Sequence, residues 1–220
     1  MNITGELLPA GSLVVFQGDS ITHGGRGTTD DPNHILGHSY PFLIASEAAA
    51  RYPGQGWRFI NRGVSGDKVS DLAARWQQDT LNHRPDVLSI LVGVNDANAV
   101  LQGTSADSGT GFESAYRSLL QRTVAELPAV RLVLGEPFYL PTSPVESLRE
   151  TWGTAVQIRA DIVRELADSF GATFVPYQAA LEAAVALAPA EHWIWDGVHP
   201  TYAGQRILAD TWINAVTRQP

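Results

Sequence analysis

The chain has 220 residues, 44% of them apolar and 17% charged, and this composition predicts one globular domain, residues 1–220, with a sizeable core. Its net charge of −8 and its scattered Lys and Arg side chains argue against nucleic acid as a partner, because a polyanion would be repelled. The absence of cysteine excludes a disulfide framework, a thiolate metal site and a cysteine nucleophile.

The N-terminal stretch MNITGELLPAGS has neither the basic start nor the long apolar run of a secretory signal. No uncharged run approaches the length that spans a membrane. We therefore expect a cytoplasmic protein with no membrane partner.

Short apolar runs bounded by turn residues alternate with longer segments of helical period, which predicts an α/β fold of parallel strands and crossover helices. The third and fourth runs are nearly continuous Val, Leu and Ile, as in strands covered on both faces. In chain order, the predicted strands are Leu13–Gln17, Trp57–Asn61, Asp86–Val94, Val130–Glu136 and Thr173–Pro176.

Helices are predicted where start signals and apolar periodicity agree. The stretch Thr110–Glu113 has the pattern of a capping box and leads into an apolar stripe that ends at Leu127. A second stripe recurs every four residues from Ile158 to Phe170 and stops at Gly171, a residue type that tolerates a left-handed helix end. Further helices are predicted at His38–Arg51, Val69–Asp79 and Thr201–Val216.

Two segments fit no regular structure. Thr22–Gly37 is rich in Gly, Asp and Asn, and Glu191–Thr201 contains two Trp, an Asp and a His. Loops of this length in compact domains are usually functional, so both are candidates for a site. The GGRG stretch of the first lacks the Lys-Ser/Thr of a phosphate loop, and we expect it to form a flexible wall beside Ser20. Its Arg26 is expected either in a structural salt bridge or in contact with a substrate.

Four short blocks lie just past predicted strands or in the second irregular segment. Open α/β sheets bind their ligands at the carboxyl ends of their strands, so position and residue type both indicate a site. The blocks are GDS (18–20), GVSGD (63–67), GVND (93–96) and DGVH (196–199).

These blocks supply the parts of nucleophilic catalysis. A serine hydroxyl needs an imidazole to accept its proton and a carboxylate to hold that imidazole, and Ser20, His199 and Asp196 are of these types. The Asp-x-x-His spacing lets a tight turn bring the carboxylate to its own histidine. Oxyanion donors would be the Ser20 N–H, the Gly66 N–H and the Asn95 side-chain amide. Glycine at position 66 would let backbone approach the reacting atom, where a Cβ would obstruct.

In this order and spacing, the blocks resemble the signature of the SGNH/GDSL hydrolases. The resemblance covers nearly the whole chain and implies a three-layer α/β/α fold with a central five-stranded parallel sheet, which is flavodoxin-like. It also implies the catalytic and oxyanion roles of the matching residues. The four signature residues and the Asp three positions before the histidine match Ser20, Gly66, Asn95, His199 and Asp196.

Longer strings are similar to the bacterial branch that includes acetyl-xylooligosaccharide esterases. They are FQGDSIT, NRGVSGDKVSDLAARW, PDVLSILVGVNDAN, GEPF and WDGVHPTYAG. This similarity implies a serine esterase for acetyl groups on carbohydrates such as xylooligosaccharides, with an acyl-enzyme on Ser20, a small-molecule ester as partner and no metal or cofactor. Relatives of the branch form oligomers, and six Trp in a small chain also indicate subunit interfaces, so we expect a homo-oligomer.

The substrate contacts predicted beyond the triad are Asp19, Arg26, Phe138 and Trp195. Trp195 adjoins Asp196, and the flat face of an aromatic ring suits the apolar face of a sugar as well as ordinary packing. Phe138 follows Glu136 and Pro137 at the end of the fourth predicted strand, at the same edge of the sheet.

Three alternatives stay open. A lipid or aryl esterase, similar to a lysophospholipase, would use the same triad with a different pocket. A non-catalytic binding protein would be expected to have lost a triad residue, and none is missing. A metal-dependent hydrolase would use His34 and His38, but Ile35 stands where the zinc-protease pattern requires Glu. The remaining histidines have no partner pattern, namely His23, His83 and His192.

Overall fold

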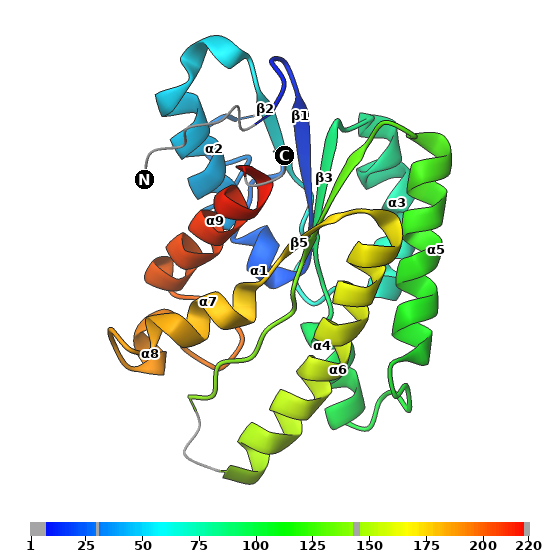
Figure 1. Ribbon diagram of the computed structural model, residues 1–220, viewed down its shortest axis with the longest axis vertical. Coiled ribbons are helices and arrows are strands. Elements are labelled where there is room, and N and C mark those ends of the chain that lie inside the picture. The colour runs from blue at the N-terminus through cyan, green and yellow to red at the C-terminus, as the bar shows by residue number, and fades with distance from the viewer. Residues whose placement is uncertain (1–7, 30, 143–145, 218–220) are drawn as a thin grey trace.

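The computed structural model describes residues 8–29, 31–142 and 146–217. Five parallel strands form one sheet in the order β2-β1-β3-β4-β5 (Figure 1). This is the strand order of flavodoxin-like doubly wound folds, so the predicted α/β class and five-stranded sheet are confirmed. The strands are β1 (Leu13–Gly18), β2 (Arg58–Asn61), β3 (Val87–Leu91), β4 (Arg131–Gly135) and β5 (Thr173–Val175).

Helices cover both faces of this sheet (Figure 1). One face carries α2 (Tyr40–Arg51), α7 (Tyr177–Ala184) and α9 (Tyr202–Thr217). The other carries α3 (Val69–Asp79), α5 (Thr110–Glu126) and the second half of α6 (Glu146–Phe170). The shorter helices are α1 (Ser20–His23), α4 (Val94–Leu101), α8 (Ala190–Trp193) and the 3₁₀ turns Pro53–Gln55 and Leu81–His83.

Strand β1 is buried along its whole length because both faces of the sheet are covered. Side chains alternate between the faces, so Val14 and Phe16 join the core under α2 and α9, whereas Val15 joins the core under α3 and α5. Phe16 packs edge-on against Tyr40 of α2 with ring centroids 5.7 Å apart. Burying one such side chain contributes about 1.5–3 kcal/mol, which fixes the strand that leads into the GDS block.

The predicted strand Asp86–Val94 is too long. β3 ends at Leu91, and Val94 already begins α4, because the chain turns at Gly93 with a φ of 136°. An unbroken apolar run does not reveal this change from strand to helix. The prediction therefore missed α4.

The predicted capping box at Thr110 is wrong, although the helix itself is confirmed. Gly109 is the N-cap of α5 and Thr110 lies inside the helix. The cap is the Asp107 carboxylate, which accepts hydrogen bonds from the backbone N–H groups of Gly109, Gly111 and Phe112 at 3.0, 2.9 and 2.8 Å. A carboxylate two residues before the N-cap thus accepts hydrogen bonds from three backbone N–H groups at the start of the helix.

The predicted helix Val69–Asp79 is confirmed at both ends, and the other predicted helices are confirmed with shifted ends. α6 begins well before the predicted stripe and ends at Phe170, followed by Gly171 with a φ of 60°. The segment Thr22–Gly37 starts inside α1, and residues 32–38 are turns. His34 and His38 therefore do not share a helical face.

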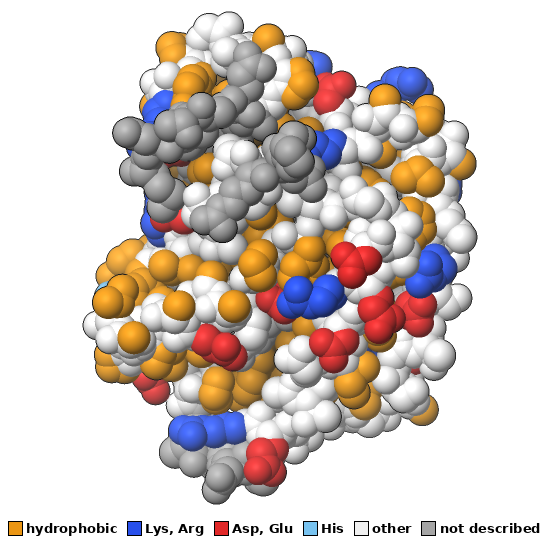
Figure 2. Space-filling view, viewed as in Figure 1, with side chains coloured by type: hydrophobic (Ala, Val, Ile, Leu, Met, Phe, Trp, Pro, Cys, Tyr) orange, Lys and Arg blue, Asp and Glu red, His pale blue; other side chains and the backbone are white. Residues whose placement is uncertain are grey.

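The face shown in Figure 2 carries Lys and Arg side chains among acidic ones, with no single basic patch. Among the described residues, no helix has the length and apolar character needed to cross a bilayer.

Candidate active site

The carboxyl ends of β1 and β3 meet at the centre of the sheet. From β1 the chain crosses to β2 on one side, whereas β3 lies on the other, so this edge is a topological switch point. Ser20 begins the helix after β1, and Asn95 lies in the helix after β3. Two of the predicted site residues are thus placed beside each other by strand order alone.

Helix α1 holds Ser20 at its first position. The Asp19 carboxylate accepts a hydrogen bond from the Ile21 N–H at 3.0 Å and caps the helix, and Gly24 ends it with a φ of 47°. A helix of this length has little stability by itself, so the cap and the buried Ile21 and Thr22 fix the direction of the Ser20 side chain.

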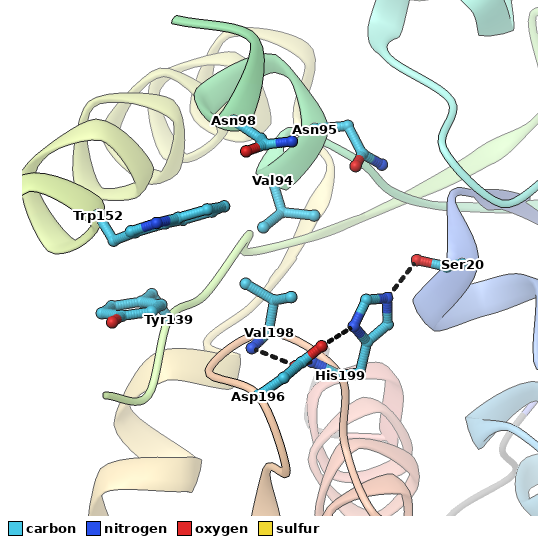
Figure 3. A pocket seen from close by; sticks show the side chains of 9 residues that line it. All are labelled: Ser20, Val94, Asn95, Asn98, Tyr139, Trp152, Asp196, Val198 and His199. Atoms are coloured by element: carbon cyan, nitrogen blue, oxygen red, sulfur yellow. Dashed lines mark hydrogen bonds and ion pairs between the residues drawn. The ribbon is translucent and has the colours of Figure 1, made fainter. Parts of the chain in front are cut away.

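Ser20, His199 and Asp196 form one hydrogen-bonded line (Figure 3). The Ser20 Oγ lies 2.8 Å from the His199 Nε2, and the His199 Nδ1 lies 2.6 Å from an Asp196 carboxylate oxygen. The other oxygen of Asp196 accepts the backbone N–H groups of Val198 and His199 at 3.1 and 2.8 Å. Carboxylate and imidazole are thus held within one turn.

The environment of Asp196 keeps its carboxylate ionised. Burial alone would raise the pKa of Asp196, but the hydrogen bonds from the His199 N–H, the His199 ring and the Val198 N–H outweigh it and lower that pKa. An ionised Asp196 accepts a hydrogen bond from the protonated Nδ1 of His199. The Nε2 of that ring is then unprotonated and faces the Ser20 hydroxyl.

Gly66 and Asn95 are the other two residues predicted to donate hydrogen bonds to the oxyanion. Gly66 has a φ of 88°, and among the described residues no atom other than those of its chain neighbours lies within 4 Å of a Cβ built on it. The left-handed backbone at position 66 requires glycine, and the space that a side chain would occupy there is open. The Asn95 amide donates one hydrogen bond to the Asp67 carbonyl at 3.1 Å, which holds it beside the Gly66 segment.

A cavity of about 350 Å³ opens beside the Ser20 and His199 pair (Figure 3). Val94 and Val198 face each other across it near the reacting groups, and Trp152 stacks on Tyr139 at its far end, with ring centroids 5.7 Å apart. We call this cavity the valine pocket. Asn95, Asn98 and Asp196 complete its wall.

A second cavity of about 280 Å³ adjoins the same pair of residues. Its side chains come from α1, the following loop, the segment after β2 and the turn before α9. We call it the histidine pocket, because His23 and His38 line it with Ser65 and Trp195.

Two of the four predicted substrate contacts are buried. Asp19 is 1% exposed and Phe138 is completely buried, so neither reaches a substrate. Arg26 donates to the Gly63 and Gly27 carbonyls at 2.8 and 3.4 Å, and it lines neither pocket. This arrangement is neither the salt bridge nor the substrate contact expected of Arg26.

Trp195 is the predicted contact that the structure leaves accessible. Its side chain is 67% exposed, and its ring lies nearly parallel to that of His199, with centroids 6.1 Å apart. Its backbone N–H donates to the His199 carbonyl at 3.1 Å.

Asp19 remains electrostatically important although it is buried. Burial raises the pKa of Asp19 to about 7, against the lowering effects of the Ile21 N–H and His199. One carboxylate oxygen has no hydrogen-bond partner among the described residues. Asp19, which directly precedes Ser20, therefore changes its charge near neutral pH.

The sequence analysis missed Tyr139, Trp152 and Asn98. Tyr139 and Trp152 come from separate segments without a motif, so nothing local relates them. Asn98 follows Asn95 by three residues, and this spacing would have placed both amides on one face if α4 had been predicted.

The metal alternative at His34 finds no support in its surroundings. His34 is an exposed residue whose Nδ1 lies 2.6 Å from the Asp31 carboxylate. In the part of the chain that the structure describes, no three His, Asp or Glu side chains are grouped as metal ligands would be.

A doubly wound sheet with a hydrogen-bonded Ser, His and Asp at its switch point is the arrangement that serine hydrolases use. The sequence profile of the GDSL-like lipase/acylhydrolase family matches residues 16–207. The chain belongs to this family and is a carboxylic ester hydrolase.

Several individual proteins are similar to this chain over most of its length. An acetylxylan esterase from Geobacillus stearothermophilus is 32% identical over 212 residues, which cover 94% of each protein. A putative GDSL-like lipase from Parabacteroides merdae has a solved structure that is similar with a TM-score of 0.89, at 36% identity over 95% of this chain and 97% of that one. A catalytic mutant of Axe2, an acetylxylan esterase from Geobacillus stearothermophilus, gives 0.84 at 30% identity over 96% of each chain.

Proposed function

We propose that this protein is a serine esterase that removes acetyl groups from carbohydrates such as xylooligosaccharides, with Ser20 as nucleophile and His199 and Asp196 as its base. The observation that carries the proposal is the continuous contact from the Ser20 Oγ through His199 to Asp196, at 2.8 and 2.6 Å. The acetyl-carbohydrate substrate is inferred from the 32% identity to an acetylxylan esterase.

The geometry supports a two-step reaction. The His199 Nε2 takes the Ser20 proton while the Oγ attacks the ester carbonyl carbon, and His199 then returns that proton to the departing alcohol oxygen. The acetyl group stays on Ser20 as an ester. Water, deprotonated by the same imidazole, attacks this ester, and acetic acid and free Ser20 are formed.

The negative charge of each tetrahedral intermediate needs fixed donors. We assign this role to the Ser20 N–H, the Gly66 N–H and the Asn95 amide. Since only one N–H of the Asn95 amide is needed for the Asp67 carbonyl, the second remains available for the oxyanion. The contact with Asp67 orients this donor before the substrate binds.

The Geobacillus enzyme offers independent support for the serine and aspartate roles. Catalytic mutants of Axe2 have been solved in which one serine or one aspartate is replaced by alanine. Ser20 and Asp196 would supply the same two residue types here.

A lipid or aryl esterase is the second candidate, and the valine pocket favours it. Its volume of about 350 Å³ exceeds what an acetyl group needs, and Val94, Val198 and Trp152 give it apolar walls. A longer acyl chain would gain burial there. The chemistry at Ser20 would be unchanged.

One experiment separates these candidates. Acetate release from acetylated xylooligosaccharides is compared with hydrolysis of short-chain and long-chain 4-nitrophenyl esters, for the wild type and Ser20→Ala, with and without a chelator. We expect chelator-resistant, Ser20-dependent acetate release. Cleavage of long-chain esters alone would reject the carbohydrate substrate but keep the triad, and activity in Ser20→Ala would reject the mechanism.

Two predictions from the sequence concern the protein's location in the cell and its oligomeric state. We propose a cytoplasmic homo-oligomer, and exposed apolar side chains such as Val185 and Leu187 support the second part. Cell fractionation tests the location, and light scattering after size exclusion tests the assembly.

A further inference from the structure

Two cavities of different chemistry meet at the Ser20 and His199 pair. An ester has two sides, an acyl group and an alcohol, and a hydrolase needs a place for each. The valine pocket is walled near the serine by Val94 and Val198, whereas the histidine pocket presents ring nitrogens and a hydroxyl. Which side of the substrate enters which cavity decides specificity, and this question rests on the proposed function.

The hydrogen bond at His23 sets the tautomer of its ring. The Gly25 N–H donates to the His23 Nδ1 at 3.2 Å, so this nitrogen carries no proton and the neutral ring must carry one on Nε2. Burial and the nearby Arg26 and His38 lower the pKa of His23, which favours the neutral ring. The Nε2 N–H has no acceptor among the described residues and is available to a ligand.

His38 and Ser65 also bring polar groups without partners to this pocket. Across the described chain, neither side chain makes a hydrogen bond. The His38 ring lies over Gly25, where a Cβ would come within 3.0 Å of its Cε1, so the ring is held against the loop backbone. Hydroxyl-rich ligands are recognised by such unpaired donors and acceptors at fixed positions.

Trp195 adds an exposed aromatic face to the rim of the same pocket. Its ring lies beside the imidazole of His199, the group that protonates the departing alcohol. Sugars combine a face of C–H groups with a rim of hydroxyls, which suits an aromatic plate with hydrogen-bonding groups beside it.

We propose that the histidine pocket binds the carbohydrate alcohol of the ester, with His23 and His38 hydrogen-bonded to its hydroxyls, and that the valine pocket receives the acyl group. The His23 Nε2 N–H acts as a donor to a sugar oxygen. The two histidines determine specificity for the alcohol and take no part in proton transfer at Ser20.

The test compares one substrate that has sugar hydroxyls with one that lacks them. The variant His23→Phe/His38→Phe keeps two flat rings and removes their nitrogens, and His23→Gln/His38→Gln restores an amide donor near each Nε2 position. For each protein, kcat/KM is measured on acetylated xylobiose and on 4-nitrophenyl acetate. His34→Ala is the matched control, because this exposed histidine lies in the same loop but lines neither pocket.

We expect the ratio of kcat/KM on acetylated xylobiose to that on 4-nitrophenyl acetate to fall about tenfold or more in the Phe variant, mainly through KM. The Gln variant should recover most of this ratio, and His34→Ala should leave it unchanged. Circular dichroism and thermal unfolding establish that each variant is folded.

An unchanged ratio in a folded Phe variant would overturn the inference. If that variant does not fold, each single Phe variant gives the same comparison, and a ratio within twofold of the wild type in both rejects the histidine pocket. A wild type that cleaves 4-nitrophenyl acetate but no sugar acetate would instead reject the carbohydrate substrate itself. The two failures are therefore distinguishable.

Discussion

Gly197 lies directly against the ring of Tyr139. A Cβ at Gly197 would be 2.7 Å from the Tyr139 Cε2, and Gly197 has a φ of 98°. The Gly197 carbonyl also accepts the Leu140 N–H at 3.0 Å. The turn that carries Asp196 and His199 is thus braced by the segment that follows β4.

Replacing Gly197 by alanine should displace this turn. The left-handed backbone costs about 1–3 kcal/mol for alanine, and the Tyr139 ring must move as well. We expect kcat to fall about 100-fold, because small displacements of a catalytic group are costly. Gly171→Ala is the matched control, since its φ is 60° but a Cβ built there meets no atom of the described residues within 4 Å beyond its chain neighbours. Equal activity losses in both variants would contradict the role of Tyr139.

Ser20→Ala and Asn95→Ala should lower kcat by different amounts. Loss of the nucleophile should lower kcat roughly 10⁴-fold or more. Loss of one oxyanion donor among several should lower it about 10²- to 10³-fold. Steady-state kinetics on 4-nitrophenyl acetate measures both. A near-normal rate in Ser20→Ala, or a serine-directed inhibitor attached to another residue, would contradict the mechanism.

Asp196→Asn should lower kcat by up to about 10⁴-fold with little change in stability, because an amide N–H facing Nδ1 favours the wrong tautomer of His199. The chain contains a matched control. Asp31 and His34 have the same spacing and the same 2.6 Å contact, but they line neither pocket. Asp31→Asn should therefore keep full activity, and comparable losses in the two variants would refute the assignment.

Asp107→Ala should destabilise the protein more than Thr110→Ala does. The Asp107 carboxylate accepts three backbone N–H groups at the start of α5, and Thr110 makes no cap. We expect a loss of about 1–2 kcal/mol in the free energy of unfolding for Asp107→Ala, against less than about 0.5 kcal/mol for Thr110→Ala. Urea denaturation of both variants measures these losses in the free energy of unfolding. A larger loss for Thr110→Ala than for Asp107→Ala would support the capping box predicted from the sequence.

The buried Asp19 predicts a pH dependence of stability. Its pKa rises from 3.8 to about 7 on folding, so the folded chain holds a proton that the unfolded chain has released. Its contribution to stability is fully present below 3.8 and is lost as the pH rises through about 7.

Asp19→Asn cannot ionise, and it keeps an oxygen for the Ile21 N–H. Its stability relative to the wild type should therefore increase between pH 4 and 7, by up to about 1.4 kcal/mol per pH unit, and level off above pH 7. Urea denaturation of both proteins across this range measures the difference. A difference that does not vary with pH would show that Asp19 stays ionised in the folded chain.

The sequence predicted the sheet well because fully buried strands have a simple pattern. Apolar runs such as Val130–Glu136 cover β4 with one extra residue at each end. The pairing of Asp196 with His199 could be predicted because both residues lie in one turn, whereas Ser20 is brought to His199 only by the fold. Helix α4 was missed because a buried strand and the helix after it are both rich in Val and Leu. The burial of Asp19 and Phe138 could not be predicted, because it depends on how the segments pack in three dimensions.

The contact between Ser20 and His199 joins residues 179 positions apart. During synthesis, the nucleophile therefore leaves the ribosome long before its base exists, and an unfinished chain holds a serine with no group to activate it. A product truncated before position 199 would lack His199 altogether. Hydrolytic activity should thus report only chains that have been synthesised past His199 and have folded, so ester turnover measures their amount in a translation reaction.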